Sequence, residues 1–529
     1  MTHELEEKKE QEQIQPESST PSNEETSRED ERSEEKPEEK TEQKKLLFDD
    51  KQIFSKKEKW LIVCMIGFAA IFSPFTANIY FPAIPTLTVV FNKSTELINL
   101  TVTMYMILQG IAPMFWGTLS DNLGRRPITA ACLFVLALSC VGLALTPTSA
   151  YWLLMVLRCL QAAGSASTIA IGAGVISDIS TPEERGGFFG LFTLGPMVGP
   201  AIGPVVGGAL AQGLGWRSIF WFLVIAASLC LLIIIMIMPE TLLSVRSKQT
   251  KLAKILYTPL VPVVGRKKKG TLPEEIPEVP KKPFQNPLKL FVKFDIVLLL
   301  LANALICAVF YGIIASISSL FDEVYGLDTT RIGLCFLAIG GGMGIGSSAN
   351  GKLMDMWYER EKKRFIERMS KDSEKQVDPK TLPRLPEFPL EKALFTPEAR
   401  LGFVPVLIVL LAASTAGYGW AIEKRANIAG PLILQIIIGY MCISIMNGSS
   451  TIMIDLVPGQ GSAVTACNNF VRCLLSAALV SVIELIFDAI GVGWTYILLT
   501  GITLLSLPVL YLELKLGPKI RQKRFKPVA

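Results

Sequence analysis

The sequence predicts an all-α polytopic membrane protein, with twelve transmembrane helices in two pseudo-symmetric six-helix bundles. Half of the 529 residues are hydrophobic, and the mean hydropathy is +0.42. Long apolar runs recur along the chain, and each is long enough to cross a hydrocarbon core of about 30 Å as a helix. Charged residues make up 19% of the chain and cluster between these runs.

Twelve apolar runs define the predicted spans. They are residues 60–82, 98–119, 127–146, 151–177, 187–212, 217–238, 294–320, 331–354, 401–421, 429–456, 463–486 and 493–514. The segments around them divide the chain into an acidic tail (1–55), a first bundle (56–239), a linker (240–293), a second bundle (294–515) with a long loop (355–400), and a basic tail (516–529).

The distribution of Lys and Arg predicts the orientation in the membrane. The linker carries twelve of them, the loop 355–400 carries eleven, and the tail after Leu514 carries six. The short loops on the other side carry at most two each. Because positive residues are retained on the cytoplasmic side, we expect both termini and the long loops in the cytoplasm. The first fifty residues are polar, so we expect no cleavable secretory signal.

Other parts of the composition exclude several classes of function. Residues 1–45 hold sixteen acidic and eight basic residues, which predicts a disordered segment, either a solvated tail or a phosphorylatable regulatory one. The ten cysteines lie in predicted spans without C-x-x-C spacing, which predicts packing residues and no metal site. The net charge of +5 is explained by cytoplasmic loops beside an anionic leaflet, so we expect no nucleic-acid partner.

A weak internal repeat supports two related halves. Gly117-Thr-Leu-Ser-Asp121 follows the second span, and Gly351-Lys-Leu-Met-Asp355 follows the eighth. Asp178 ends the fourth span, as Asp455 ends the tenth. Parallel halves of this kind surround a central substrate site in secondary transporters.

Three motifs resemble those of a known family. Gly117-Thr-Leu-Ser-Asp-Asn-Leu-Gly-Arg-Arg-Pro127 resembles G-x-L-x-D-x-x-G-R-R, the loop signature of the major facilitator superfamily. Leu154–Gly164 resembles the fourth-span motif L-x-x-x-R-x-x-Q-G-x-G, with Ala162 in place of its first glycine. Gly195–Gly208 resembles the fifth-span motif of drug:proton antiporters, and Asn78–Pro85 is similar to fungal twelve-span antiporters of the quinidine-resistance type.

The resemblance implies a cytoplasmic latch in the first motif. Its aspartate, Asp121, is expected to face the N-terminus of span eleven near 462–466, where a helix dipole favours an anion. Arg125 is expected to pair with Asp178. Anchoring by positive residues alone would explain the two arginines but not Asp121 or the glycine spacing. The latch residues are Gly117, Asp121, Gly124, Arg125, Arg126 and Asp178, with Asp355 in the second-half copy.

Arg158 lies inside the fourth span, where a charged arginine costs about 2.5–3.5 kcal/mol on insertion scales. Such a residue is normally turned inward and paired, and Gln161 lies one turn away on the same face. Arg158 is either a structural arginine bonded to carbonyls or, as the family implies, part of proton coupling. Arg472 in span eleven is a second buried cation. Asn78 replaces an acidic residue common in span one, so the proton carrier is unassigned.

Glycine and proline recur in the fifth span, although both are poor residues for a helix interior. The prolines remove amide donors, so this face must be covered by protein or water. The glycines predict close approach of another helix, which we expect to be span eight near Gly340–Gly346. The stripe consists of Gly195, Gly199, Pro200, Gly203, Pro204, Gly207 and Gly208.

Polar and aromatic residues within the spans are candidates for substrate contact, and helix packing is the alternative for each. They are Asn78, Tyr80, Tyr105, Gln109, Asn303, Tyr311, Gln435, Tyr440 and Asn447. Amides and aromatic rings suit amphipathic or cationic organic molecules. The absence of a clustered carboxylate means that a cationic substrate is not required.

Together these features predict a secondary active transporter of the plasma membrane, or alternatively the vacuolar membrane. It would export drugs or amphipathic or cationic molecules by proton-coupled antiport, as a monomer and without a cofactor other than the proton. Proton-coupled uptake of a nutrient or polyamine, or a non-transporting sensor, are the alternatives. No metalloprotease, hydrolase or P-loop signature is present, so we expect no enzyme.

Overall fold

The computed structural model describes residues 54–180, 184–242, 257–261, 287–372, 404–457 and 461–525. The chain divides into two compact units, Met1–Ile53 and Phe54–Ala529, and all described residues belong to the second. The predicted acidic tail up to residue 53, most of the linker, and the long loop from residue 373 therefore lie outside the described residues.

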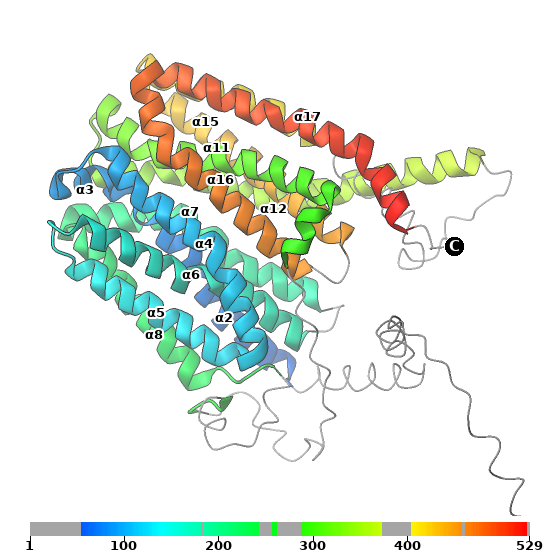
Figure 1. Cartoon of the computed structure of the whole chain (residues 1–529), viewed down its shortest axis with the longest axis horizontal. Coiled ribbons are helices and arrows are strands. Elements are labelled where there is room, and N and C mark those ends of the chain that lie inside the picture. The colour runs from blue at the N-terminus through cyan, green and yellow to red at the C-terminus, as the bar shows by residue number, and fades with distance from the viewer. Residues whose placement is uncertain are drawn as a thin grey trace, which may run out of the picture. The chain divides into compact units, whose positions relative to one another are not determined.

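The first bundle consists of helices joined by short turns (Figure 1). They are α2 (Lys56–Asn78), the 3-10 turn η2 (Phe81–Ala83), α3 (Ile84–Phe91), α4 (Thr95–Leu123), α5 (Arg125–Leu145), α6 (Tyr151–Ile179), α7 (Arg185–Leu214) and α8 (Arg217–Ile237). Ser55 begins α2 with a capping box, in which its side chain accepts from the amide of Glu58 and Glu58 bonds the amide of Ser55. Together α2, η2 and α3 make up the first span.

The second bundle repeats the arrangement. It consists of the 3-10 turn η4 (Pro287–Val292), α11 (Phe294–Tyr325), α12 (Thr329–Asp372), α14 (Val404–Glu423), α15 (Ala429–Leu456), α16 (Gly461–Ile490) and α17 (Val492–Phe525). Two helices continue past the predicted span ends at 354 and 514. Their charged extensions are rich in good helix formers, so nothing ends the helix where the apolar run ends.

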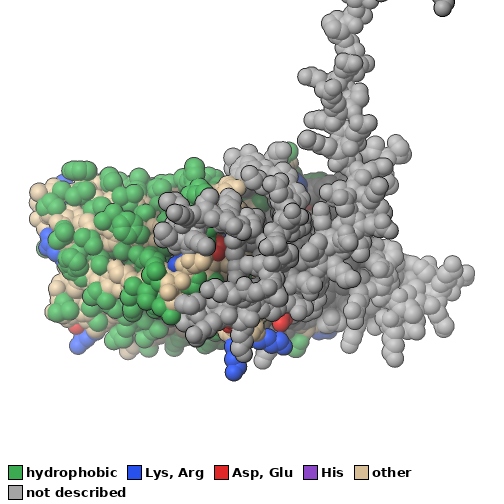
Figure 2. Space-filling model, turned by 90° about the horizontal axis from the view of Figure 1, so that it is seen from below, with side chains coloured by type: hydrophobic (Ala, Val, Ile, Leu, Met, Phe, Trp, Pro, Cys, Tyr) green, Lys and Arg blue, Asp and Glu red, His purple; other side chains and the backbone are tan. Residues whose placement is uncertain are grey.

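Eleven helices are long and apolar enough to cross a membrane, counted over the described part of the chain. The remaining predicted span is the fifth, 187–212, which corresponds to α7 and is helical throughout despite Pro196, Pro200 and Pro204. Hydrophobic side chains cover much of the described surface in Figure 2, with Lys and Arg side chains at its edges. The predicted all-α membrane fold is confirmed.

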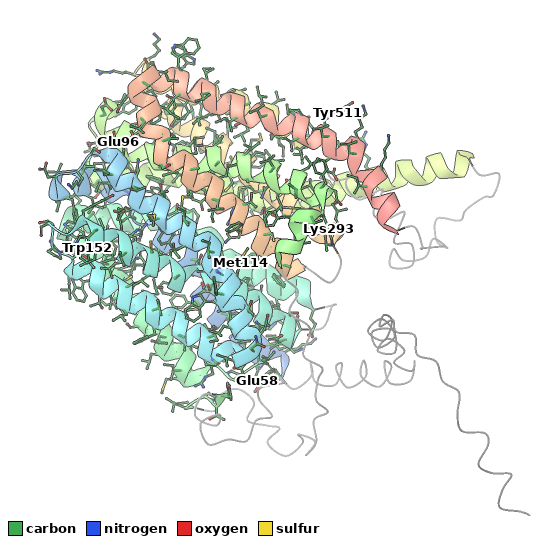
Figure 3. All side chains as sticks on the ribbon, viewed as in Figure 1. Glu58, Glu96, Met114, Trp152, Lys293 and Tyr511 are labelled. Carbon is green, nitrogen blue, oxygen red and sulfur yellow. The ribbon has the colours of Figure 1, made fainter. Side chains whose placement is uncertain are left out.

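The bundle has two distinguishable ends. We call the end that holds Arg125, Asp178 and Glu240 the linker side, and the end with the short turns at Asn92, Gly326 and Gly491 the turn side. Figure 3 labels Glu58 and Lys293 near the linker-side starts of α2 and α11, and Glu96 at the turn-side start of α4.

The two bundles meet along two pairs of helices, α4 with α16 and α7 with α12. We call these contacts the α4–α16 seam and the α7–α12 seam. Both are tight toward the turn side. A Cβ added to Gly110 of α4 would lie 3.0 Å from Cys473 Cβ, and one added to Gly340 of α12 would lie 2.5 Å from Ala201 Cα.

Both seams open toward the linker side. Gly117 follows Gly110 by about two helical turns on the same face, and within the described residues nothing lies within 4 Å of a Cβ placed there. The same holds for Gly190, about three turns before Ala201 on α7, and for Gly344, about one turn after Gly340. The structure is therefore closed on the turn side and open on the linker side.

Candidate substrate pathway between the two bundles

Arg158 on α6 is fully buried between two tyrosine rings of the first bundle. Its guanidinium carbon lies 4.2 Å from the ring centre of Tyr80 and 4.4 Å from that of Tyr105. Its Nη1 donates to Gln161 Oε1 at 2.6 Å, which is the polar contact that the spacing predicts. Gln161 Nε2 in turn contacts Cys140 Sγ at 3.3 Å. Cation–π contacts and one amide therefore hold this cation.

Two donor atoms of this guanidinium are not satisfied. Arg158 Nε and Nη2 are buried and have no hydrogen-bond partner among the described residues. The hydroxyls of Tyr80 and Tyr105 are engaged elsewhere, with Thr101 at 3.0 Å and Ser165 at 2.9 Å. A buried guanidinium with unmade bonds is costly, so this site retains a capacity to bind an anion or to rearrange. Its predicted role in proton coupling stays a prediction.

Arg472 lies near the middle of α16, where α4 and α11 approach it. Its Nη2 donates to Asn469 Oδ1 at 2.8 Å, and its Nε is buried without a partner in the described part of the chain. Asn469 Nδ2 donates across the seam to the backbone oxygen of Gln109 at 2.9 Å. Cys307 and Tyr311 of α11 and Cys473 of its own helix also lie near Arg472. This cation lies where the two bundles meet.

A second amide pair lies beside it on the second bundle. Asn303 Nδ2 of α11 donates to Asn468 Oδ1 at 2.7 Å, and Asn468 Nδ2 donates to Ser450 Oγ at 3.1 Å. Asn303 is almost fully buried. Among the predicted substrate residues, Gln109, Asn303 and Tyr311 are thus gathered around one junction of α4, α11 and α16. Asn468 and Asn469, which precede Arg472 in the sequence, complete it.

Several predicted substrate residues lie elsewhere. Gln435 is fully buried inside the second bundle and donates to Tyr418 Oη at 3.1 Å, so its predicted substrate contact stays a prediction. Asn447 donates to Ser347 Oγ of α12 at 3.4 Å, and the Tyr440 backbone packs against Gly346. Asn78 donates to the Pro74 oxygen at 2.6 Å, within its own helix. A polar residue in a span does not by its presence indicate which face it occupies.

The predicted stripe of α7 is divided between two partners. Added Cβ atoms at Gly195, Gly199, Gly203 and Gly207 would all meet α2 or the Ile79 turn, within the same bundle. The expectation that the stripe faces span eight is therefore wrong for these four glycines. Pro204 and Gly208, which also belong to the stripe, contact span eight as predicted, and so does Ala201 on the same face. One helix thus carries two close contacts, because glycines occur at more than one helical phase.

Span eight likewise divides its glycines between two neighbours. Gly333 and Gly340 of α12 face α7, and an added Cβ at Gly333 would lie 2.5 Å from the Pro204 oxygen. Gly342 and Gly346 face Ile436 and Tyr440 of α15. The predicted α7 contact is present at Gly340 but does not extend to Gly346.

The predicted ion pair of the latch is present on the linker side. Arg125 Nε donates to Asp178 Oδ2 at 3.0 Å, and Nη1 lies 2.6 Å from Asp121 Oδ1. Asp121 is 62% exposed and pairs with Arg125. Its expected contact with the N-terminus of span eleven stays a prediction, because the side chains of residues 461 and 462 lie outside the described residues. The latch role itself stays a prediction, and the side chains at Gly351–Asp355 lie outside the described residues.

Glu240 is a part of this loop that sequence reasoning missed. Its carboxylate is buried and accepts from four backbone amides, those of Arg125, Arg126, Thr241 and Leu242, at 2.9–3.1 Å. It thereby satisfies the orphan amides at the start of α5. Burial raises the pKa of Glu240 above its usual value, and the four amides oppose that rise. A Glu two residues after the end of span six was the available signal.

The position of Gly124 in this turn requires a glycine. Its φ is +105°, a conformation that other residues rarely adopt. A Cβ there would also meet the Glu240 carboxylate at 2.5 Å. The glycine of the loop signature therefore allows Glu240, the first residue of the linker, to pack directly against the motif.

Comparisons with known proteins agree with this architecture. A family model described as Major Facilitator Superfamily matches residues 28–367. Citrate exporter 1 of Aspergillus niger is 38% identical over 477 residues, covering 89% of this chain and 88% of that protein. The MFS antiporter QDR1 of Candida albicans is 32% identical over 465 residues, covering 86% and 87%.

Two solved structures share the fold. The human organic anion transporter MFSD10 has a TM-score of 0.55 and 17% identity, covering 86% of this chain and 100% of that one. A bacterial homologue of the human lysosomal transporter Spinster has a TM-score of 0.57 and 13% identity, covering 90% and 100%. The predicted resemblance to this superfamily and to fungal antiporters is confirmed, and the matched proteins are transporters. The chain belongs to the Major Facilitator Superfamily.

Proposed function

We propose that this chain is a secondary active transporter that exports small organic acids as carboxylates by alternating access. The observation that carries the proposal is Arg472, a half-buried cation at the junction of the two bundles. Its Nε has no partner in the described residues, and it forms no ion pair of 4.0 Å or less there.

The chemistry of this junction suits a carboxylate. A guanidinium presents a planar fork that matches a carboxylate, and charge-assisted hydrogen bonds are stronger than neutral ones. The amides of Asn303, Asn468 and Asn469 can donate to further oxygens or accept from a hydroxyl. A central position between two bundles is where transporters of this architecture bind substrate. The name of the Aspergillus niger relative, a citrate exporter, supports the same class.

A second candidate is proton-coupled export of amphipathic or cationic drugs. The name of the Candida albicans relative, an MFS antiporter, favours it. Tyr311 beside Arg472 offers an aromatic surface for such molecules. The single cation at the junction disfavours a cationic substrate electrostatically, so we place this candidate second.

The remaining features of the transporter follow as proposals. We place the linker side in the cytoplasm, since the Lys- and Arg-rich segments lie there, and the protein in the plasma membrane as a monomer. The proton is the coupling ion. An open linker side then exposes the junction to cytoplasmic substrate, as export requires.

The test uses the full chain in proteoliposomes with radiolabelled citrate as the probe and an imposed pH gradient. We expect citrate exchange, and we expect Arg472→Gln to raise KM about 10- to 100-fold, the loss of a hydrogen-bonded charge worth about 1.5–3 kcal/mol. Arg331→Gln is the matched control, because Arg331 is 71% exposed on the turn side. Transport of tetraphenylphosphonium without transport of citrate would establish the second candidate instead.

A further inference from the structure

Glu484 is a carboxylate shared by the two bundles on the turn side. It lies on α16, beyond Arg472. Its Oε1 accepts from Asn99 Nδ2 of α4 at 3.4 Å and from Ser319 Oγ of α11 at 3.2 Å. Asn99 belongs to the first bundle, and Ser319 and Glu484 belong to the second. Glu484 therefore bonds across the α4–α16 seam where that seam is closed.

No cation compensates this carboxylate. Within the described residues, no Lys or Arg lies within 4.0 Å of Glu484. The titratable groups that face it are two acids, Glu96 of α4 and Asp488 of its own helix, and the Tyr496 phenol of α17. Burial of an unpaired charge at such a contact costs much more free energy than burial of a hydrogen-bonded neutral carboxyl group.

Asn99 supplies the second, independent observation. Its side chain is fully buried, and its Oδ1 has no hydrogen-bond partner in the described part of the chain. A carboxylate can only accept hydrogen bonds, but a protonated carboxyl group also donates one. A proton on Glu484 would provide the donor that the buried Asn99 oxygen lacks. A protonated Glu484 therefore offers a donor to a buried oxygen that has none among the described residues.

We propose that Glu484, Asn99 and Ser319 form a proton-binding site that holds the turn side closed. A proton from water on the turn side binds the Glu484 carboxylate, and the new O–H donates to Asn99 Oδ1 across the seam. When the proton leaves through the open linker side, the carboxylate becomes charged and the bond to Asn99 Oδ1 is lost. The two bundles then separate on the turn side, where water hydrates the carboxylate.

This site deepens the proposed function, because it rests on the proton as coupling ion. A proton bound from the turn side stabilises the conformation in which the linker side is open. Export then requires the proton to leave before the turn side opens to release substrate. Arg472 and Glu484 both lie on α16, so substrate binding and proton binding act on the same helix.

The experiment measures the distance between the bundles on the turn side without any substrate. Nitroxide labels on non-natural residues replace Val89 and Ile490, which are 81% and 46% exposed and lie in different bundles. Pulsed electron resonance then gives the closed and open populations of the reconstituted full chain from about pH 5 to about pH 8. We expect the closed population to grow as the pH falls, by up to about tenfold per pH unit for one proton.

Three variants in the labelled background decide the proposal. Glu484→Gln mimics the neutral group, so we expect a closed population that no longer depends on pH. Asn99→Ala removes the acceptor, so we expect closing to require a lower pH. Glu323→Gln is the matched control, because Glu323 is exposed at the same end, and it should keep the wild-type profile.

Any of three results would overturn the proposal: a wild-type pH profile in Glu484→Gln, a turn side that opens as the pH falls, or a wild-type profile that does not change with pH. The populations are measured without citrate, so they are independent of whether carboxylates are exported. Loss of citrate transport with a normal pH profile would reject the proposed function alone. A flat wild-type profile with normal citrate transport would reject the proton site alone.

Discussion

The two seams between the bundles are built from different chemistry. The α7–α12 seam is mainly backbone packed against backbone at Gly208, Gly333 and Gly340. Its polar contacts lie at its turn-side end, where the Thr330 amide donates to Gln212 Oε1 at 2.8 Å and Thr330 Oγ1 donates to the Gly208 oxygen at 3.4 Å. The α4–α16 seam has one such glycine, Gly110, and otherwise carries polar contacts between Asn99 and Glu484 and between Asn469 and Gln109. Both seams are closed on the turn side and open on the linker side.

This difference predicts that the two seams respond differently to protons and to ligands. Close backbone packing depends on shape alone and does not respond to protons or to a ligand. Polar contacts change with protonation and with the charge of what binds beside them. We infer that the α7–α12 seam sets where the bundles pivot, while the α4–α16 seam responds to what occupies it.

The largest effect is expected at the α7–α12 seam. In Gly340→Leu the new side chain would collide with Ala201, because even a Cβ would lie 2.5 Å from its Cα. Overpacking costs about 1–3 kcal/mol or more, so we expect the closed population to fall about 100-fold and transport to stop. Gly341→Leu is the control, with nothing within 4 Å of its Cβ among the described residues. Equal loss in both variants would show that the seam is not responsible.

A smaller effect is expected from the single glycine of the other seam. Gly110→Leu would press against Cys473 and Phe470, which are 3.0 Å and 3.4 Å from an added Cβ. We expect about a tenfold loss of the closed population, measured by the same label distances. Gly117→Leu should leave the closed turn side intact, since its Cβ meets nothing in the described residues. It should instead slow turnover by hindering closure of the linker side.

Removal of one polar contact should lower the closed population less than either glycine substitution does. Asn469→Ala deletes the bond to the Gln109 oxygen, and a neutral hydrogen bond contributes about 0.5–1.5 kcal/mol. We expect the closed population to fall about fivefold, together with weaker citrate binding because Asn469 also orients Arg472. Asn303→Ala should weaken citrate binding without changing the closed population, since Asn303 bonds within its own bundle. If both variants open the turn side equally, the cross-seam bond is unimportant.

The smallest effect is expected at Thr103. Its Oγ1 contacts the Ala477 oxygen across the α4–α16 seam at 3.4 Å, a long bond, and also its own helix at Asn99 at 3.2 Å. Thr103→Val keeps the shape, so we expect less than about a twofold change in the closed population. An effect as large as that of Gly340→Leu would contradict the distinction between the two seams.

The local motifs were predictable and their partners were not. Arg158 with Gln161 and Arg125 with Asp178 are bonded as the sequence indicates. The α7 glycines were recognised, yet the sequence could not tell that Gly195, Gly199, Gly203 and Gly207 face α2, because helical phase is known only relative to a neighbour. Glu240 was missed because a single acid after a span has no periodicity to mark it.

The sequence by itself determined the membrane-spanning helices, the two related halves, the family and the two buried arginines. Apolar length, repeated motifs and the cost of a charge in lipid are properties of local sequence, and they act before any helix meets another. Only the tertiary structure decided which cation lies between the bundles, which glycines form the seams, and that Asn99 and Glu484 meet across 385 positions of sequence. Such contacts join separate helices, so their pairing depends on the packing of all helices together.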